Sequence, residues 1–206
     1  YKVEEISRKR STQIFKNIEI LDDAIEQRKK VSFQYNEYDA TKNFLPRMQG
    51  RKFVMNPYFL VNNNGKYYLV CNYDKYDNLA NYKIECMSNL EILQDDVKPL
   101  KSLPNMENFN QDDYINEHIY MMTGASVKAV IKLDNAKAIN DIIDWFGDKV
   151  EIREKNGELF AELKVNEQAL IYWAIQYGKN VEVLSPEYTR DKIRETLKEI
   201  SGKYEV

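Results

Sequence analysis

Residues 56–87 decide the fold of the first half of this chain, and they read NPYFLVNNNGKYYLVCNYDKYDNLANYKIECM. The stretch holds three apolar-rich runs, at residues 57–61, 66–73 and 81–87. The NNNG segment at residues 62–65 separates the first two runs, and Asn and Gly tolerate the positive φ that a tight hairpin turn requires. The aromatic and β-branched residues around the turn favour strands. The pattern therefore predicts a three-stranded antiparallel meander, on which we expect the main functional surface.

The segment before the meander predicts one helix and two further strands. An apolar stripe with the spacing i, i+3, i+7 indicates a helix from residue 17, capped by Asn17, and the stripe consists of Ile18, Leu21 and Ile25. Residues 31–35 alternate with period two, as a strand does, and residues 51–55 are expected to begin the next strand. Together with the meander this makes about five short strands. We expect so small a sheet to close into a compact barrel, because closure removes exposed edges.

From residue 126 onward the order of elements predicts a second domain. The strand signals lie at residues 127–133, 150–153, 159–165 and 181–184. Helical stripes follow the first, third and fourth of these strands, and the turn pair Asn156-Gly157 joins the second strand to the third. The resulting order, β-α-β-β-α-β-α, is a split βαβ of ferredoxin-like type with one added helix. The fold class is therefore α+β.

The expected domain organisation has four parts. Residues 1–16 are polar and mixed in charge, so they are either a linker or a solvated helix. Residues 17–97 form the small barrel, residues 98–125 a connector rich in Pro, Asn and Asp, and residues 126–206 the ferredoxin-like domain. The chain begins at Tyr1 without an initiator Met, so we expect it to be part of a longer protein.

The composition of the chain limits the cellular compartment and the kinds of partner that we expect. The 206 residues are 43% apolar and contain no apolar run of about 18 residues, so we expect no membrane association. Two cysteines are too few for a disulfide framework, which favours a reducing, cytoplasmic setting. A net charge of −3 is low for a general duplex-DNA binder. A local basic excess between residues 28 and 52 nevertheless indicates an anion site; its cations are Arg28, Lys29, Lys30, Lys42, Arg47, Arg51 and Lys52.

Motifs for catalysis or metal binding are lacking in the sequence. The single histidine, His118, lies in the connector with no nucleophile signature nearby. Cys71 and Cys86 are expected to be buried thiols, since a zinc site would need carboxylates from distant segments. We therefore predict a protein that is not an enzyme and has no catalytic residue, metal or cofactor.

The meander resembles the WYL-domain family at three places, which are residues 57–61, 65–70 and 81–87. The family is named for a Trp-Tyr-Leu triplet, which here stands as YYL at residues 67–69. Residues 177–187, YGKNVEVLSPE, are similar to the closing strand and helix entry of the WCX module that usually follows. The resemblance covers residues 18 to 202, nearly the whole chain.

The resemblance implies an Sm-like, SH3-type β-barrel that senses a ligand within a dimeric bacterial transcriptional regulator. Promoter DNA is then bound through a winged helix-turn-helix that this chain lacks, and the effector is a nucleotide or a single-stranded nucleic acid. Some relatives instead modulate CRISPR effector enzymes or accompany helicases. The alternative is therefore a protein-interaction and dimerisation scaffold whose ligand site has degraded.

The resemblance also points to residues on the third strand of the meander. The family pattern aromatic-Arg-aliphatic-Asp stands here as Tyr82-Lys83-Ile84-Glu85. Two positions that often carry Arg in the family are Cys86 and Phe53 here, and a change of this kind weakens or re-aims a phosphate site. Lys83 is the first choice for an anion contact. The alternative for Lys83 is a solvated charge or a pair with Glu85.

Further candidates for the ligand site are basic and aromatic residues of the neighbouring segments. Arg51 and Lys52 supply positive potential, or are an ordinary polar strand entry. Tyr35 and Tyr68 are candidates for stacking on a base, although an aromatic residue at strand spacing is more often core. The predicted ligand site comprises Lys83, Arg51, Lys52, Tyr35, Tyr68, Tyr82 and Glu85.

Overall fold

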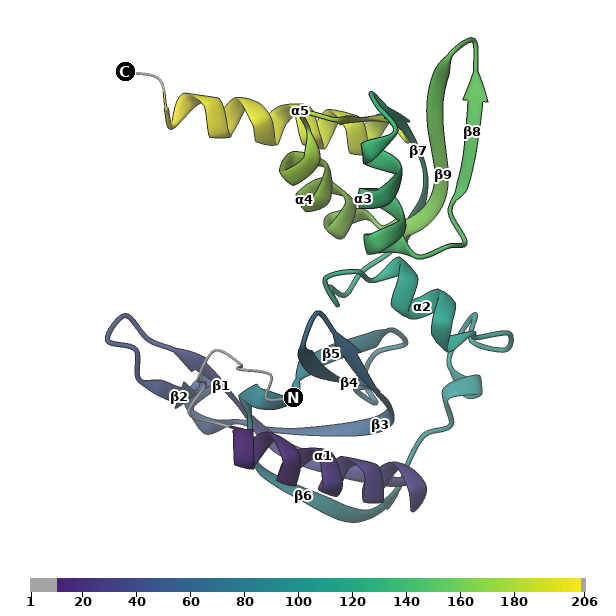
Figure 1. The fold of residues 1–206 in the computed structure, drawn as a ribbon. Helices are drawn as coiled ribbons and strands as arrows, with labels where there is room; N and C mark the ends of the chain where they lie inside the picture. Colours follow the sequence, from purple (N-terminus) through teal and green to yellow (C-terminus); the bar gives the residue numbers. More distant parts are fainter. Residues whose placement is uncertain (1–10, 205–206) are drawn as a thin grey trace, which may run out of the picture. The chain divides into compact units, whose positions relative to one another are not determined.

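The computed structural model describes residues 11–204, and the chain divides between residues 109 and 110 into two compact units (Figure 1). Residues 1–10, which make up most of the predicted linker, lie outside the described residues. Among the helices of residues 11–204, none has the length and apolarity needed to cross a membrane.

The first unit consists of one helix and six strands with three short 3₁₀ turns. In chain order these are α1 (Ser11–Glu26), β1 (Lys29–Tyr38), β2 (Phe44–Pro46), η1 (Arg47–Gly50), β3 (Lys52–Asn63), β4 (Lys66–Asn72), β5 (Leu79–Lys83), η2 (Ile84–Cys86), β6 (Met87–Asp96) and η3 (Leu100–Ser102). The antiparallel sheet has the order β2-β1-β3-β4-β5, and β6 pairs with β1. The predicted meander is confirmed in its order, since β3, β4 and β5 are consecutive neighbours, but its third strand ends at Lys83 and does not run to Met87 as predicted.

The predicted closed barrel is wrong, because no ladder joins β5 to β6 in the described part of the chain. The 3₁₀ turn η2 follows β5 at once and redirects the chain, so that β6 pairs with β1 instead. At the end of β5, the backbone N–H of Lys83 donates to the hydroxyl of Tyr35 at 3.3 Å. A side chain thus satisfies a backbone donor at the last residue of β5, where the ladder with β4 ends.

Helix α1 covers the core of this unit, and it begins at Ser11, six residues before the predicted start. The predicted capping role of Asn17 is also wrong. Asn17 is 1% exposed, and its amide donates to the carbonyls of Ile84 at 3.3 Å and Met87 at 3.1 Å. One buried side chain of α1 therefore holds both ends of η2. Leu21 of α1 packs into the apolar cluster beneath the helix, which includes Val31, Phe33, Met55, Leu69 and Ile84.

The second unit has the element order that the sequence predicts. Helix α2 (Gln111–Glu117) comes first, followed by β7 (Ser126–Leu133), α3 (Lys137–Phe146), β8 (Glu151–Lys155), β9 (Glu158–Asn166), α4 (Glu167–Tyr177), β10 (Val181–Ser185) and α5 (Glu187–Gly202). The strands form an antiparallel sheet in the order β10-β7-β9-β8. Its core is centred on Trp173, and Asn166 caps α4 by accepting the N–H of Ala169 at 3.0 Å. The chain is thus a mixed α and β protein with two antiparallel sheets.

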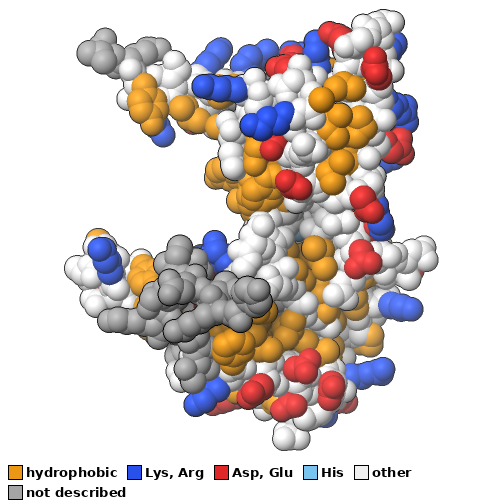
Figure 2. Space-filling model, viewed as in Figure 1, with side chains coloured by type: hydrophobic (Ala, Val, Ile, Leu, Met, Phe, Trp, Pro, Cys, Tyr) orange, Lys and Arg blue, Asp and Glu red, His pale blue; other side chains and the backbone are white. Residues whose placement is uncertain are grey.

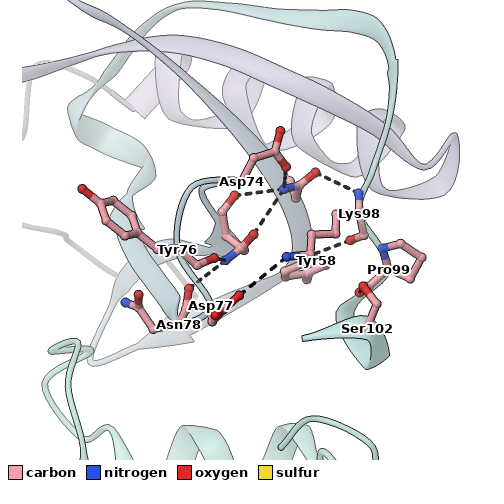
Figure 3. A network of polar contacts seen from close by, with 10 residues as sticks. Tyr58, Asp74, Tyr76, Asp77, Asn78, Lys98, Pro99 and Ser102 are labelled. Atoms are coloured by element: carbon pink, nitrogen blue, oxygen red, sulfur yellow. Dashed lines mark hydrogen bonds and ion pairs between the residues drawn. The ribbon is translucent and has the colours of Figure 1, made fainter. Parts of the chain in front are cut away.

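A buried pair of asparagines organises one end of the first unit (Figure 3). Asn56 and Asn72 are both fully buried. The amide of Asn56 donates to Asp74 at 2.7 Å, and its carbonyl oxygen accepts the backbone N–H of Lys98 at 2.9 Å. Asn72 donates to two backbone carbonyls of the β4–β5 turn, those of Tyr76 and Asn78, at 2.7 and 2.9 Å. The pair therefore joins β3, β4, the turn and the segment after β6.

The same network fixes the charge of Asp74. The hydrogen bond from Asn56, followed by the one from Lys30, holds the pKa of the Asp74 carboxyl below its usual value. Lys30 Nζ lies 2.6 Å from Asp74 Oδ2. A carboxylate that stays ionised keeps accepting both hydrogen bonds at neutral pH.

We predict that Asn56→Ala lowers the free energy of unfolding by about 2 kcal/mol, because it leaves the buried N–H of Lys98 without its acceptor. The control is Asn62→Ala, an exposed asparagine on the same strand, which should change stability by less than about 0.5 kcal/mol. Urea denaturation followed by circular dichroism measures both. Equal effects of the two substitutions would contradict the role assigned to the network.

Candidate ligand site on the first unit

Tyr35 of β1 stands where the ends of β1 and β5 meet. Its ring packs edge-on against Tyr82, with 5.1 Å between the ring centroids, while its hydroxyl accepts the N–H of Lys83. Burial is the main cause that raises the pKa of the Tyr35 hydroxyl well above its usual value, and the nearby thiol of Cys86 adds to it. Tyr35 therefore stays neutral, and its hydroxyl accepts a hydrogen bond from the backbone at the end of β5.

The aromatic residues of β1, β3 and β5 form a compact cluster. Tyr82 lies 5.3 Å from Phe33 and 5.8 Å from Phe53, and the two Phe rings stack at 5.9 Å. Phe53 therefore replaces a possible cation with a ring that joins the core. Burial raises the pKa of the Tyr82 hydroxyl, and the positive charges of Arg47 and Arg51 oppose that rise. The Tyr82 hydroxyl thus lies within the field of two guanidinium groups.

Arg51 and Lys52 are adjacent in sequence, but they meet different partners. The guanidinium of Arg51 lies over the ring of Phe53, 5.7 Å from its centroid, and has no carboxylate partner within residues 11–204. Lys52 Nζ instead lies 3.1 Å from Glu91, and both side chains are more than half exposed. An exposed pair of this kind contributes little to stability, so a competing anion can displace the carboxylate.

Lys83 lies directly across the β4–β5 ladder from Tyr68, while Tyr82 lies across from Leu69. Directly paired residues share a face of the sheet, so Lys83 shares a face with Tyr68, and Tyr82 points to the opposite, core side. No ion pair joins Lys83 to Glu85 or to any other carboxylate of the described chain. The ammonium of Lys83 therefore depends on solvent or on a ligand for its counter-charge.

Tyr68 is 7% exposed, so its ring is enclosed. Burial is the first cause that raises the pKa of its hydroxyl, and the carboxylate of Glu85 and the thiol of Cys86 contribute next. Tyr68, Glu85 and Cys86 thus lie near one another on the side of Lys83. Stacking of a base on Tyr68 or Tyr35 would require the ring to leave its packed position.

The seven predicted residues therefore divide into two groups. One group, with Lys83 at its centre, includes Tyr68 and Glu85, and the other gathers around Arg51 and Tyr82. Lys52 is engaged with Glu91 on β6. Tyr35 links the two groups, because its ring contacts Tyr82 and its hydroxyl binds Lys83; the structure does not gather all seven residues into a single patch.

The predicted ligand site did not include Arg47, which belongs to the second group. Arg47 pairs with Glu37 at 3.2 Å and lies close enough to Tyr82 to influence its pKa. Residues 48–50 all have positive φ, and the N–H of Arg51 bonds back to the carbonyl of Met48 at 3.2 Å. This tight turn brings the two arginines together. The local basic excess was the available signal, but it did not predict the turn.

His118 has a structural role in the second unit. It is 5% exposed, its ring stacks on Tyr114 at 4.0 Å, and its Nδ1 lies 2.8 Å from the carbonyl oxygen of Tyr114. Burial lowers the pKa of His118. Within residues 11–204 no group of three or more His, Cys, Asp or Glu side chains converges in a way that suits a metal ion.

The fold defines a two-unit protein in which a helix-covered antiparallel sheet precedes a βαββαβ unit. The model of the WYL domain matches residues 16–92, and the model of the WCX domain matches residues 125–201. The chain belongs to the WYL-domain family and carries the WCX module after its WYL domain.

The chain is similar to one curated protein and to solved structures. The chain is 29% identical over 156 residues to the "Uncharacterized HTH-type transcriptional regulator YobV" of Bacillus subtilis (strain 168), a match that covers 72% of the chain and 46% of the relative. A structure titled "Crystal structure of a CRISPR Cas-related protein" matches 98% of the chain and 55% of its own length, with a TM-score of 0.54 and 16% identity. The proteasome accessory factor B/C (PafBC) of Arthrobacter aurescens matches 99% and 29%, with a TM-score of 0.41 and 15% identity.

The chain covers only part of the length of the proteins it matches. The chain spans less than half of the curated relative and just over half of the CRISPR Cas-related protein. The likeness to the CRISPR Cas-related structure concerns the fold alone, since the identity is 16%.

The two thiols provide a probe of the site. Cys71 is fully buried, and burial raises the pKa of its thiol, whereas Cys86 is half-buried beside Tyr35. We predict that a thiol reagent labels one cysteine per native chain and two per unfolded chain, and that Cys86→Ser removes the native signal. Mass spectrometry of the labelled peptides identifies the site. Labelling of Cys71 in the native state would contradict this assignment.

Proposed function

We propose that this chain is the ligand-sensing and dimerisation region of a transcriptional regulator, and that its effector is a nucleotide or a single-stranded nucleic acid. The WYL and WCX domains and the regulator name of the curated relative support this proposal. Promoter DNA would be bound by a helix-turn-helix region of the kind that the relative's name records. The proposed role is not enzymatic, and its setting is the cytoplasm.

Finer structural assignments are part of the proposal. We assign residues 17–97 of the first unit to an Sm-like sheet that stays open, and residues 126–206 of the second unit to the ferredoxin-like type with an added helix. The order β10-β7-β9-β8 and the β-α-β-β-α-β-α succession support the second assignment. Residues 98–125 are then the connector.

The observation that carries the proposal is the position of Lys83. The ammonium of Lys83 lacks a carboxylate partner in the described chain, and the backbone N–H of Lys83 donates to the hydroxyl of Tyr35. An anionic ligand that binds Lys83 therefore acts on the last residue of β5. The single ammonium of Lys83 suits one phosphate group of such a ligand.

The same position suggests how occupancy is transmitted. Residue 83 is followed at once by η2, and both ends of η2 are held by the amide of Asn17 from α1. A shift of Lys83 on binding would move η2 and, through Asn17, helix α1. Because α1 is the first described helix, it is the element that would carry the shift toward the N-terminal side.

Lys83→Ala should weaken the binding of labelled oligonucleotides and of mononucleotides, and should reduce the slope of log K against log salt by about 0.7 for a single strand. Fluorescence anisotropy at two ionic strengths measures both quantities. The control is Lys101→Ala, an exposed lysine of η3, which should leave the slope unchanged. Absence of binding at low salt, or equal binding by wild type and Lys83→Ala, would count against the proposal.

A second candidate function is a scaffold that dimerises and contacts a partner protein. Exposed large apolar side chains on the second unit favour it, and Figure 2 shows hydrophobic side chains gathered on the surface of this unit. The exposed residues include Ile143, Tyr172, Tyr188, Leu197 and Tyr204, each more than 40% accessible. An exposed apolar patch on a soluble protein often marks an interaction surface.

Light scattering tests the scaffold function. If this apolar surface joins two copies, the wild type should have the mass of a dimer, and Leu197→Lys should shift it toward the monomer without altering the circular dichroism spectrum. A wild type that remains monomeric at high concentration would exclude the dimer on which this candidate function depends.

A further inference from the structure

A cavity of about 210 Å³ opens on the first unit, and five elements contribute to its wall. Helix α1 supplies three residues, and β1, β2, η2 and the start of β6 supply the others. Apolar cavities of about 150 Å³ hold a molecule of the size of benzene, whereas drug-sized ligands occupy pockets of about 300 to 1,000 Å³. The volume therefore suits one ring or two fused rings, and it is too small for a whole nucleotide.

The polar side chains of the wall already have partners within the protein. The amide of Asn17 donates to two backbone carbonyls, and its oxygen accepts a hydrogen bond from Gln13 at 3.0 Å. Asn36 and Ser88 bond to each other at 2.9 Å, and Glu85 has a partner as well. A ligand that buried further polar or charged groups here would leave those groups unpaired, which costs free energy. The wall therefore favours an uncharged ligand that needs no hydrogen bond.

The other side chains of the wall are apolar, and they are Ile14, Phe44 and Met87. The ring of Phe44 lies 5.0 Å from that of Tyr38, its direct neighbour across the β1–β2 ladder, so the ring is held in place. Aromatic rings pair favourably with one another, and a methionine adapts its shape and makes favourable sulfur contacts with rings. Phe44 and Met87 therefore match a flat aromatic ligand.

We propose that this cavity is a binding site for a small, uncharged aromatic molecule of one ring or two fused rings, which packs against Phe44, Met87 and Ile14. Lys83 does not line the cavity, so the site is separate from the cation assigned to the nucleic-acid effector. The inference goes beyond the proposed function, because it concerns a second ligand of different chemistry and holds whether or not the chain binds nucleic acid.

A ligand in this cavity would strengthen the connection between α1 and the end of the sheet. Asn17, which lines the cavity, already joins α1 to the carbonyls of Ile84 and Met87. An aromatic molecule would add apolar contacts between Ile14 of α1 and Met87 of β6. Because such a ligand binds only the folded chain, it should also raise the temperature of unfolding.

The first test follows the methionine methyl groups by NMR while indole is added to the whole chain. The Met87 signal should move upfield through the ring current of the ligand, with a dissociation constant of about 0.1 to 1 mM. Met121 of the second unit is also buried but does not line the cavity, so its signal should stay in place. Toluene should bind at least about tenfold more tightly than benzylammonium, which has nearly the same shape but a charge.

Two variants locate the ligand, and circular dichroism checks that each is folded. Phe44→Ala removes the ring from the wall and should weaken the binding of indole by about tenfold. The matched control is Leu45→Ala, because Leu45 is the next residue of β2, is 53% exposed and does not line the cavity. Ile14→Trp should fill the cavity from α1 and abolish the binding.

The wild-type titration decides the inference even if a variant fails to fold. Absence of a Met87 shift with millimolar indole and toluene would overturn it, as would equal affinities for toluene and benzylammonium. A Met87 signal that moves with protein concentration and not with added ligand would assign the cavity to a side chain of a second copy, and would overturn it too. Failure of oligonucleotides to bind the same sample would count against the proposed function alone.

Discussion

The first unit depends on how the backbone is satisfied at the end of β5. Buried N–H and C=O groups need partners, and in a closed barrel the neighbouring strand would supply them. Here side chains supply them instead: Tyr35 accepts the N–H of Lys83, and Asn17 donates to the carbonyls of Ile84 and Met87. The sheet can therefore end at Lys83 and remain open. This arrangement also places a charged strand end beside a cavity and joins it to the covering helix.

Buried amides stabilise the opposite end of the unit as well. Asn56 and Asn72 connect two strands, a turn and the segment after β6, and they keep Asp74 ionised against Lys30. A fully satisfied polar network in a core specifies one geometry, because an incomplete one would cost more than an apolar core. The rigid end fixes the β4–β5 hairpin. Movement on ligand binding would then concentrate at the other end, around η2.

Phe53 and Cys86, the two positions at which the resemblance led us to expect arginine, have definite surroundings in the structure. Phe53 joins the rings of Phe33 and Tyr82, and the positive charge of this region comes from Arg47 and Arg51, which a left-handed turn brings together. Cys86 lies beside Tyr35 and Tyr68, and Lys83 pairs directly across from Tyr68. The chain keeps the succession of a WYL domain and a WCX domain.

The sequence by itself determined the local elements: the β3–β4–β5 meander with its Asn-Gly turn, the α1 stripe, and the full order of the second unit. These follow from short-range periodicity and turn chemistry, which every segment carries in its own residues. Only the tertiary structure showed that the sheet stays open and which cations lie near one another. It also showed that Asn17 is buried and donates hydrogen bonds to Ile84 and Met87. Lys83 and Arg51 both read as exposed cations near strands, yet Lys83 pairs across from Tyr68 whereas Arg51 lies over the ring of Phe53. Register and long-range hydrogen bonds depend on partners dozens of residues away, so the periodicity within one segment cannot predict them.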